Sequence, residues 1–383
     1  MLARSRGLTR LLVPAALLGA AASGFEGQGA ASPAIDIASI PLFWRIHDTL
    51  KQNREPADSL WDALWATPGY ALLEQKERRR ADLTRAFRLA YRPSLAAEAR
   101  AARTASGWVA FVLPHVERIP ASRARLEAFV DSLLSADLLG SALELAATLL
   151  PEGATTGVPR PAVSLAYFID ARGYPERLLL DPLYLMSITY PRELLAHELH
   201  HYYRNRSGRP HRPFGNDLLA WNIENVAHEG IAGLLDKRTV PGLTAAGLAE
   251  RYPDPGNRAY FERYQVEYGR SNEWIALADS TFTRIAAHPD SAAALGAWLH
   301  DELPDLGRIM GAFMAVTIEE VLGRQALIDV VPDAFAFWRA YDRAARASGG
   351  RARPLSAASL EVIGKVEAAY AEDPGAGART FRR

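Results

Sequence analysis

The chain has 383 residues, 44 basic and 44 acidic side chains, and no cysteine. Its zero net charge gives no reason to expect a nucleic-acid partner, and the lack of cysteine excludes disulfides. Hydrophobic residues make up 49% of the chain, which suits a soluble globular protein with one large core or two subdomains.

The first 24 residues are predicted to be an export signal. Arginines at positions 4, 6 and 10 precede an apolar run at 11–22 that is too short to span a bilayer. Small residues at 20–24 suit cleavage, and the alternative is an uncleaved N-terminal anchor. The sequence therefore predicts an exported protein, periplasmic or extracellular in a bacterium, without stable membrane insertion after cleavage.

The remaining chain is predicted to be mostly α with a small β-sheet, the α+β class. Apolar residues recur at three and four spacing through much of 25–150, which indicates a helical N-terminal region. Residues 151–240 are predicted to form a core in which strands at 163–169 and 177–181 precede helices at 192–203 and 216–237. A helical C-terminal region at 241–370 and a disordered tail at 371–383 complete the predicted order.

The predicted helix at 192–203 carries the sequence His-Glu-Leu-His-His at 197–201. Residues four apart lie on one face of a helix, so His197 and His201 can bind one cation. Glu198 can then act as general base toward a metal-activated water, which is the zincin arrangement. His200 is rotated by about 100° from this face, and we expect it to be hydrogen-bonded or on the surface.

The second predicted helix, with Asn216 as its N-cap, supplies a third ligand. A catalytic zinc ion typically has three protein ligands and an open fourth position. We choose Glu229 because it lies on a polar stripe of an otherwise apolar helix. The other positions of this stripe are Asn222, Asn225, Gly233 and Asp236.

Two rivals for the third ligand remain open, Glu224 and His228, which lie together on a different face of the helix. Asp236 is expected to orient a ligand histidine, because metal-bound imidazoles usually donate their second N–H to a carboxylate. Asn222 and Asn225 are expected to be further polar partners of the Glu229 carboxylate.

The HExxH motif, a loop and a helix with Glu followed by a small residue resemble the gluzincins, the thermolysin-like zinc metallopeptidases. The match looks closest to bacterial domains of that clan described as putative zinc-dependent peptidases. The resemblance implies a zincin-like core, Zn²⁺ held by His197, His201 and Glu229, and Glu198 as base. It also implies that a sheet edge near the motif binds the backbone of a peptide or protein substrate.

The chain departs from the gluzincin pattern in two places. Thermolysin-type enzymes have Asp four residues after the Glu ligand, where this chain has Gly233. The 27 residues between His201 and Glu229 also exceed the spacing of the best-known members.

Gluzincins use a downstream His or Tyr to stabilise the tetrahedral intermediate. Tyr260, Tyr264 and Tyr268 share a helix face, and with His300 they are the candidates for this role. The alternative is that the tyrosines form a packing stripe.

The sequence therefore predicts a zinc metallopeptidase, a hydrolase that uses a metal-activated water and Glu198. One alternative is a scaffold protein that keeps the metal site without catalysis, which Glu198 disfavours because a structural site needs no base. The other is a zinc hydrolase of a non-peptide amide or ester, which would use the same residues. The sequence does not indicate an oligomeric state.

Overall fold

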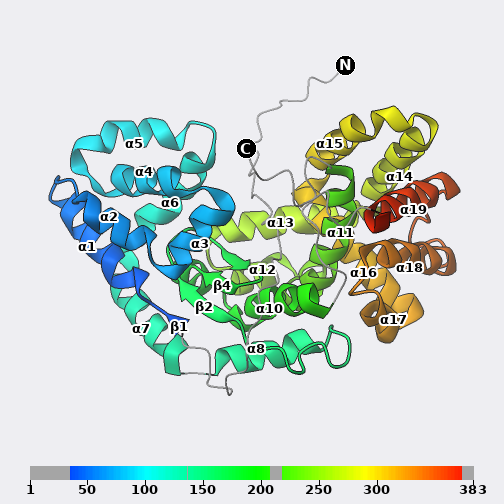
Figure 1. Cartoon of the computed structure of the whole chain (residues 1–383), viewed down its shortest axis with the longest axis horizontal. Coiled ribbons are helices and arrows are strands. Elements are labelled where there is room, and N and C mark those ends of the chain that lie inside the picture. Colours follow the sequence, from blue (N-terminus) through cyan, green and yellow to red (C-terminus); the bar gives the residue numbers. More distant parts are fainter. Residues whose placement is uncertain (1–34, 136, 208–217, 373–383) are drawn as a thin grey trace. The chain divides into compact units, whose positions relative to one another are not determined.

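The computed structural model describes residues 35–135, 137–207 and 218–372, and these are mostly helical with one small sheet (Figure 1). The predicted α+β class is confirmed at that level. The predicted export signal at 1–24, the Asn216 cap and residues 373–383 of the predicted tail lie outside the described ranges.

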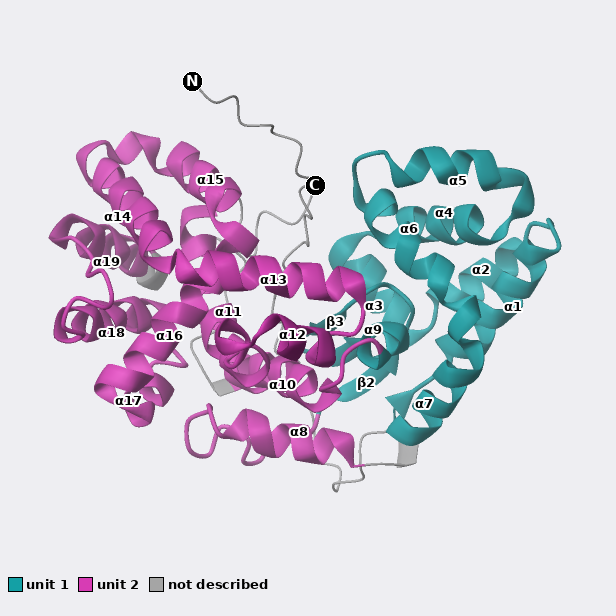
Figure 2. Ribbon diagram, turned by 180° about the vertical axis from the view of Figure 1, so that it is seen from behind, with its two compact units in different colours: residues 1–17, 31–136, 161–186 teal, residues 18–30, 137–160, 187–383 magenta. Residues whose placement is uncertain are grey.

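Two compact units make up the described chain, and their segments alternate along the sequence (Figure 2). Unit 1 contains residues 35–135 and 161–186, and unit 2 contains 137–160, 187–207 and 218–372. The small sheet belongs to unit 1 and the His-Glu-Leu-His-His motif to unit 2, so substrate binding at a sheet edge stays a prediction.

Helices of unit 1 enclose an aromatic-rich core. Phe43, Phe87 and Tyr167 are almost completely buried there, and Phe43 meets the other two rings at centroid distances of 5.2 and 4.4 Å. Such tilted or edge-to-face ring pairs stabilise a core beyond the effect of burial alone. The helices are α1 (Ser39–Lys51), α2 (Asp58–Trp65), α3 (Pro68–Glu77), α4 (Arg80–Tyr91), α5 (Ala96–Arg103), α6 (Trp108–Arg118), α7 (Arg123–Ser135) and α9 (Pro182–Met186).

The sheet has four strands in the order β1-β2-β4-β3, of which only β3 is antiparallel to its neighbour. They are β1 (Ile35–Asp36), β2 (Ala162–Leu165), β3 (Ala171–Gly173) and β4 (Arg177–Leu180). The predicted strand at 177–181 is present, whereas the one predicted at 163–169 ends at Leu165. Strands β1 and β3 were not predicted.

A buried carboxylate explains why strand β2 ends early. One oxygen of Asp181 accepts hydrogen bonds from the backbone N–H groups of Phe168 and Ile169, both at 2.7 Å, and lies 2.9 Å from Nε2 of His115. Its other oxygen accepts two backbone N–H groups at the start of α9. The chain therefore curves around Asp181 instead of continuing as a strand, and Ile169 takes a positive φ of 87°.

Unit 2 is built around α11 (Leu218–Asp236), which packs against α10, α15, α16 and α18. Most of its side chains are buried, as expected for a helix that is apolar on nearly every face. The other helices are α8 (Leu138–Ala147), α10 (Pro191–Ser207), α12 (Ala245–Arg251), α13 (Pro255–Gly269), α14 (Ser271–Ala287), α15 (Ala292–Glu302), α16 (Arg308–Leu322), α17 (Arg324–Asp329), α18 (Ala334–Ala347) and α19 (Ala357–Glu372).

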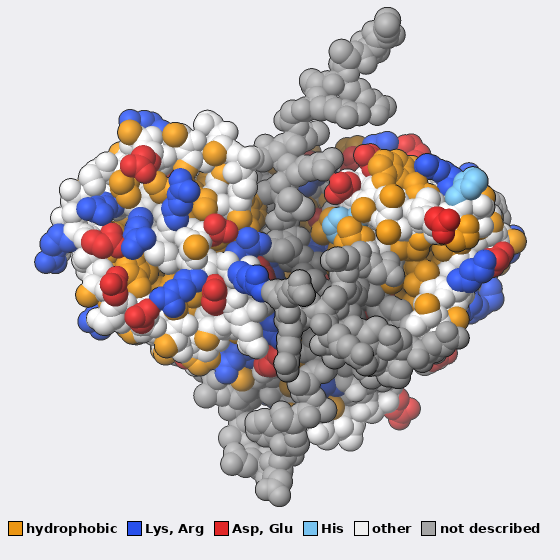
Figure 3. Space-filling view, turned by 45° about the horizontal axis from the view of Figure 1, so that its top comes forward, with side chains coloured by type: hydrophobic (Ala, Val, Ile, Leu, Met, Phe, Trp, Pro, Cys, Tyr) orange, Lys and Arg blue, Asp and Glu red, His pale blue; other side chains and the backbone are white. Residues whose placement is uncertain are grey.

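Short 3₁₀ turns that contain proline connect several helices, because proline fits the first turn of a helix. They are η1 (Pro93–Leu95), η2 (Pro120–Ser122), η3 (Val240–Gly242), η4 (Pro289–Ser291) and η5 (Pro304–Gly307), the last of which is left-handed at its final three residues. Among the described residues, no helix is both long enough and apolar enough to cross a bilayer. On the face shown in Figure 3, acidic and basic side chains lie interspersed.

Candidate metal centre

Helices α10 and α11 pack against each other and bring the three predicted ligands together. Nε2 of His197 lies 3.0 Å from Nε2 of His201 and 3.5 Å from Oε2 of Glu229. Nε2 of His201 lies 3.6 Å from Oε1 of Glu229. Two turns of α10 therefore present both imidazoles to one carboxylate of α11.

These distances fit a tetrahedral zinc ion. Ligand atoms about 2.0–2.2 Å from zinc, separated by tetrahedral angles, lie roughly 3.3 Å from one another. The two imidazole nitrogens lie 3.0 Å apart, and each has a different oxygen of the Glu229 carboxylate at 3.5–3.6 Å, so these separations fall on either side of that value. Two imidazoles and one carboxylate leave the fourth position open, which is typical of a catalytic site.

Asp236 contacts the ring nitrogen of His197 that points away from the cluster. Its Oδ1 lies 3.1 Å from Nδ1 of His197, so this nitrogen donates a proton to the carboxylate and Nε2 faces the cluster. Lys237 in turn makes an ion pair with Asp236. Asp236 lies one helical turn beyond Gly233, the position at which thermolysin-type enzymes carry an aspartate.

The two imidazoles of the cluster differ in charge: burial holds the pKa of His201 well below its ordinary value, whereas a positive charge is favoured at His197. Burial opposes protonation of His197, but the carboxylate of Asp236 outweighs burial and raises the pKa to about 9. Burial likewise opposes ionisation of Glu229, yet Arg308 and the histidines hold its pKa well below the ordinary value. A site that keeps its carboxylate ionised and favours an imidazolium is also favourable for a metal cation.

Glu198 follows the first candidate ligand on α10, and its side chain is buried. Neighbouring residues of a helix differ by about 100° in direction, so Glu198 does not share the ligand face. Glu198 is not one of the donors that the described residues bring within reach of one cation.

The rival ligands lie elsewhere. Nε2 of His200 is 3.1 Å from the carbonyl oxygen of Leu149, and His200 is fully buried, so it is hydrogen-bonded rather than on the surface. Glu224 and His228 are buried neighbours, with Oε2 and Nε2 3.8 Å apart. The group of donors that the described residues bring within reach of one cation contains neither of them.

The two asparagines of the polar stripe do not contact the Glu229 carboxylate, contrary to the prediction. Asn222 donates to the carbonyl of Gly296, and Asn225 to that of Leu306, both at 2.9 Å, so these amides attach α15 and η5 to α11. The partner of Glu229 is instead Arg308, with Nε 3.3 Å from Oε2. Sequence reasoning missed this arginine, because its approach depends on the packing of α16 on α11.

The aromatic candidates have other contacts. Tyr264 is buried and its ring stacks on Tyr268, which favours the packing interpretation for both. The hydroxyl of Tyr260 donates to Asp305 at 2.7 Å. His300 contacts the Trp221 ring, and its Nδ1 lies 3.2 Å from Oδ1 of Asn222, two helical turns before Glu229.

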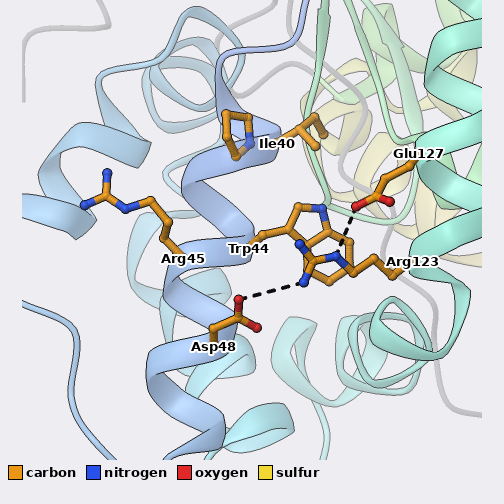
Figure 4. Close-up of a pocket in the computed structure, with 7 residues that line it drawn as sticks. Ile40, Trp44, Arg45, Asp48, Arg123 and Glu127 are labelled. Atoms are coloured by element: carbon orange, nitrogen blue, oxygen red, sulfur yellow. Dashed lines mark hydrogen bonds and ion pairs between the residues drawn. The ribbon is translucent and has the colours of Figure 1, made fainter.

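An open hollow of about 390 Å³ lies on α1 and α7 of unit 1 (Figure 4). Three of its charged groups pair with one another, since Arg123 lies 3.0 Å from Glu127 and 3.8 Å from Asp48. The guanidinium of Arg123 also covers the Trp44 ring at 4.4 Å. None of the predicted metal-site residues lines this hollow.

Residues 61–349 match the model of a family described as "Putative zinc dependent peptidase (DUF5700)". The chain belongs to this family. The match covers well over half of the sequence and includes all three residues of the candidate metal centre. It supports peptidase activity and zinc dependence at the level of the family's description. No curated protein and no solved structure was found to match.

Proposed function

We propose that the protein is a zinc metallopeptidase in which His197, His201 and Glu229 hold the metal and Glu198 is the general base. The observation that carries this proposal is the convergence of three donor side chains at 3.0–3.6 Å, with Asp236 behind the first. When bound, zinc would polarise the scissile carbonyl and make a water molecule nucleophilic.

The protein's own side chains have separate tasks in this proposal. Glu198 takes a proton from the attacking water and passes it to the leaving amine. Asp236 keeps His197 in the tautomer whose Nε2 faces the cluster. Low exposure of His197 and Glu198 limits the access of bulk water, which strengthens the electrostatic interactions around them.

Metal content tests the ligands. Purified protein should carry about one zinc per chain, as a three-ligand site requires. We expect His197→Ala and His201→Ala to lose it, and His200→Ala to retain it because His200 is hydrogen-bonded to a carbonyl oxygen elsewhere. A full equivalent of zinc in both ligand variants would refute the assignment.

Glu198→Gln separates a peptidase from a metal-binding scaffold. The amide cannot accept the water proton, so hydrolysis of a peptide mixture should fall by about 10²–10⁴-fold while zinc content stays the same. Equal turnover by both forms, or none by either, would favour the scaffold.

We also propose that the protein is exported and that its substrates are peptides or proteins. An N-terminal sequence beginning between residues 21 and 25 in protein recovered outside the cytoplasm is the expected result. A start at Met1 in such protein would instead support the uncleaved anchor.

A further inference from the structure

Arg308 lies next to the candidate metal centre although it belongs to a helix far along the chain. It is the first residue of α16, and its Nε is 3.3 Å from Oε2 of Glu229. The side chain is 23% exposed, so this ion pair is largely shielded from solvent. The contact is an ion pair and not a hydrogen bond, so the guanidinium acts on the carboxylate through its charge at short range.

Glycines set the distance between the two helices that carry this pair. A Cβ added at Gly230 would lie 2.5 Å from the carbonyl oxygen of Gly311, and one added at Gly311 would lie 3.0 Å from Cα of Gly230. Gly230 follows Glu229, and Gly311 stands one turn after Arg308. The backbones therefore touch immediately beside the ion pair, which leaves the guanidinium little freedom to retreat.

A left-handed turn fixes the direction in which α16 begins. Asp305, Leu306 and Gly307 have φ values of 48°, 56° and 84°, which is unfavourable for the two residues with side chains. Asn225 holds this turn by donating to the Leu306 carbonyl, and Tyr260 by donating to Asp305. Since Asn225 lies one turn before Glu229 on α11, the same helix anchors the turn and carries the carboxylate.

We propose that Arg308 is a positioning residue that fixes the Glu229 carboxylate in front of the two imidazoles. The inference rests on the proposed function only in taking Glu229 as a zinc ligand. Arg308 approaches Oε2, the oxygen that lies 3.5 Å from His197, while Oε1 lies 3.6 Å from His201, so the ion pair holds the carboxylate with both oxygens near the imidazoles. Without the guanidinium, the carboxylate is free to rotate away from the imidazoles.

A double-mutant cycle on zinc affinity tests the proposal. Competition with a chromogenic chelator gives the affinity of the wild type, Glu229→Ala, Arg308→Ala and the double variant. If Arg308 acts through the carboxylate, Glu229→Ala should weaken zinc affinity less in the Arg308→Ala background than in the wild type. The fold-loss of zinc affinity should be at least about tenfold smaller there. The same loss in both backgrounds would overturn the proposal.

The matched control is Arg238→Ala. Arg238 lies two residues beyond the end of α11 and makes an ion pair of 2.6 Å with Glu319 of α16, but it does not contact the ligands. The effects of Arg238→Ala and Glu229→Ala on the free energy of zinc binding should be additive. The visible spectrum of the Co²⁺-loaded protein should change in Arg308→Ala and stay the same in Arg238→Ala, because only the first variant alters a ligand.

Further measurements keep the outcomes distinct. If Arg308→Ala is unfolded, Arg308→Lys takes its place in the cycle, with a smaller but measurable coupling expected because lysine keeps only the charge. Additive losses or an unchanged spectrum in a zinc-binding protein would reject the role of Arg308 alone. A wild type that binds no zinc would reject the proposed function together with it.

Discussion

Replacing Gly230 by Ala is expected to destabilise unit 2, although alanine is the better helix former. The new Cβ would lie 2.5 Å from the Gly311 carbonyl oxygen, whereas ordinary contacts begin at 3.4 Å. Helix α16 must therefore retreat by about 1 Å, a gap large enough to lose a quarter to a half of each dispersion contact it affects. Overpacking of this kind costs about 1–3 kcal/mol.

Gly233 provides the matched control, one turn further along the same helix. A Cβ there would meet no atom within 4 Å, so Gly233→Ala keeps only the gain in helix propensity of about 1 kcal/mol. Because both variants share that gain, the difference between them isolates the overpacking cost of about 1–3 kcal/mol.

Thermal unfolding of the metal-free variants measures this difference. For a unit of about 200 residues, each kcal/mol shifts the midpoint by about 2–4 °C, so the two variants should differ by roughly 2–12 °C. Equal midpoints for Gly230→Ala and Gly233→Ala would show that α11 and α16 are not in close backbone contact.

Two further variants test buried aspartates. Asp236→Asn should weaken zinc binding by about 10–100-fold. The control is Asp342→Asn, which replaces a buried, ion-paired aspartate on α18 and should leave zinc binding unchanged. Equal zinc affinities for both variants in a competition titration would contradict the role of Asp236. Asp181→Asn should destabilise unit 1 by about 2–4 kcal/mol at neutral pH, because backbone N–H groups lose a charged acceptor. Burial alone raises the pKa of Asp181, but His115 and the N–H groups outweigh it and lower the pKa. The carboxylate therefore stabilises the fold fully above its unfolded pKa of about 3.9 and loses this effect as the pH falls through the folded value. Denaturant titrations should show this acid dependence in wild type and not in Asp181→Asn.

The residues of the candidate metal centre could be predicted because they depend on local geometry. Helical spacing alone places His197 and His201 on one face, and the same reasoning places Glu229 and Asp236 on one stripe of α11. The position of Arg308 follows instead from Gly311, Gly230 and the left-handed turn before α16. Single glycines in an apolar sequence do not reveal which helix they contact, so this partner was not predictable.

In the sheet, too, the features that depend on contacts between distant residues could not be predicted from the sequence. Strand β4 (Arg177–Leu180) was predicted from its own residues, but β1 (Ile35–Asp36) was included in a helical region. Its two residues become a strand only by pairing with β2, and Asp36 and Ser164 are 128 positions apart. The hydrogen-bond acceptors on side chains were not predictable either. Nothing in the local sequence indicates that Asp181 accepts hydrogen bonds from the backbone N–H groups that follow β2.

The alternating order of the two units has a consequence for folding cooperativity. Helix α8 packs against α10 in unit 2, yet residues 161–186 between them fold into unit 1. While unit 1 is unfolded, docking of α8 on α10 must close a loop over 148–190. Once unit 1 is folded, only 148–160 and 187–190 of this loop remain free. This shortening by a factor of about 2.5 lowers the loop-closure entropy cost by about 0.8 kcal/mol. Through this chain connectivity, folding of unit 1 favours the helix pairing that buries His200 behind the candidate metal centre.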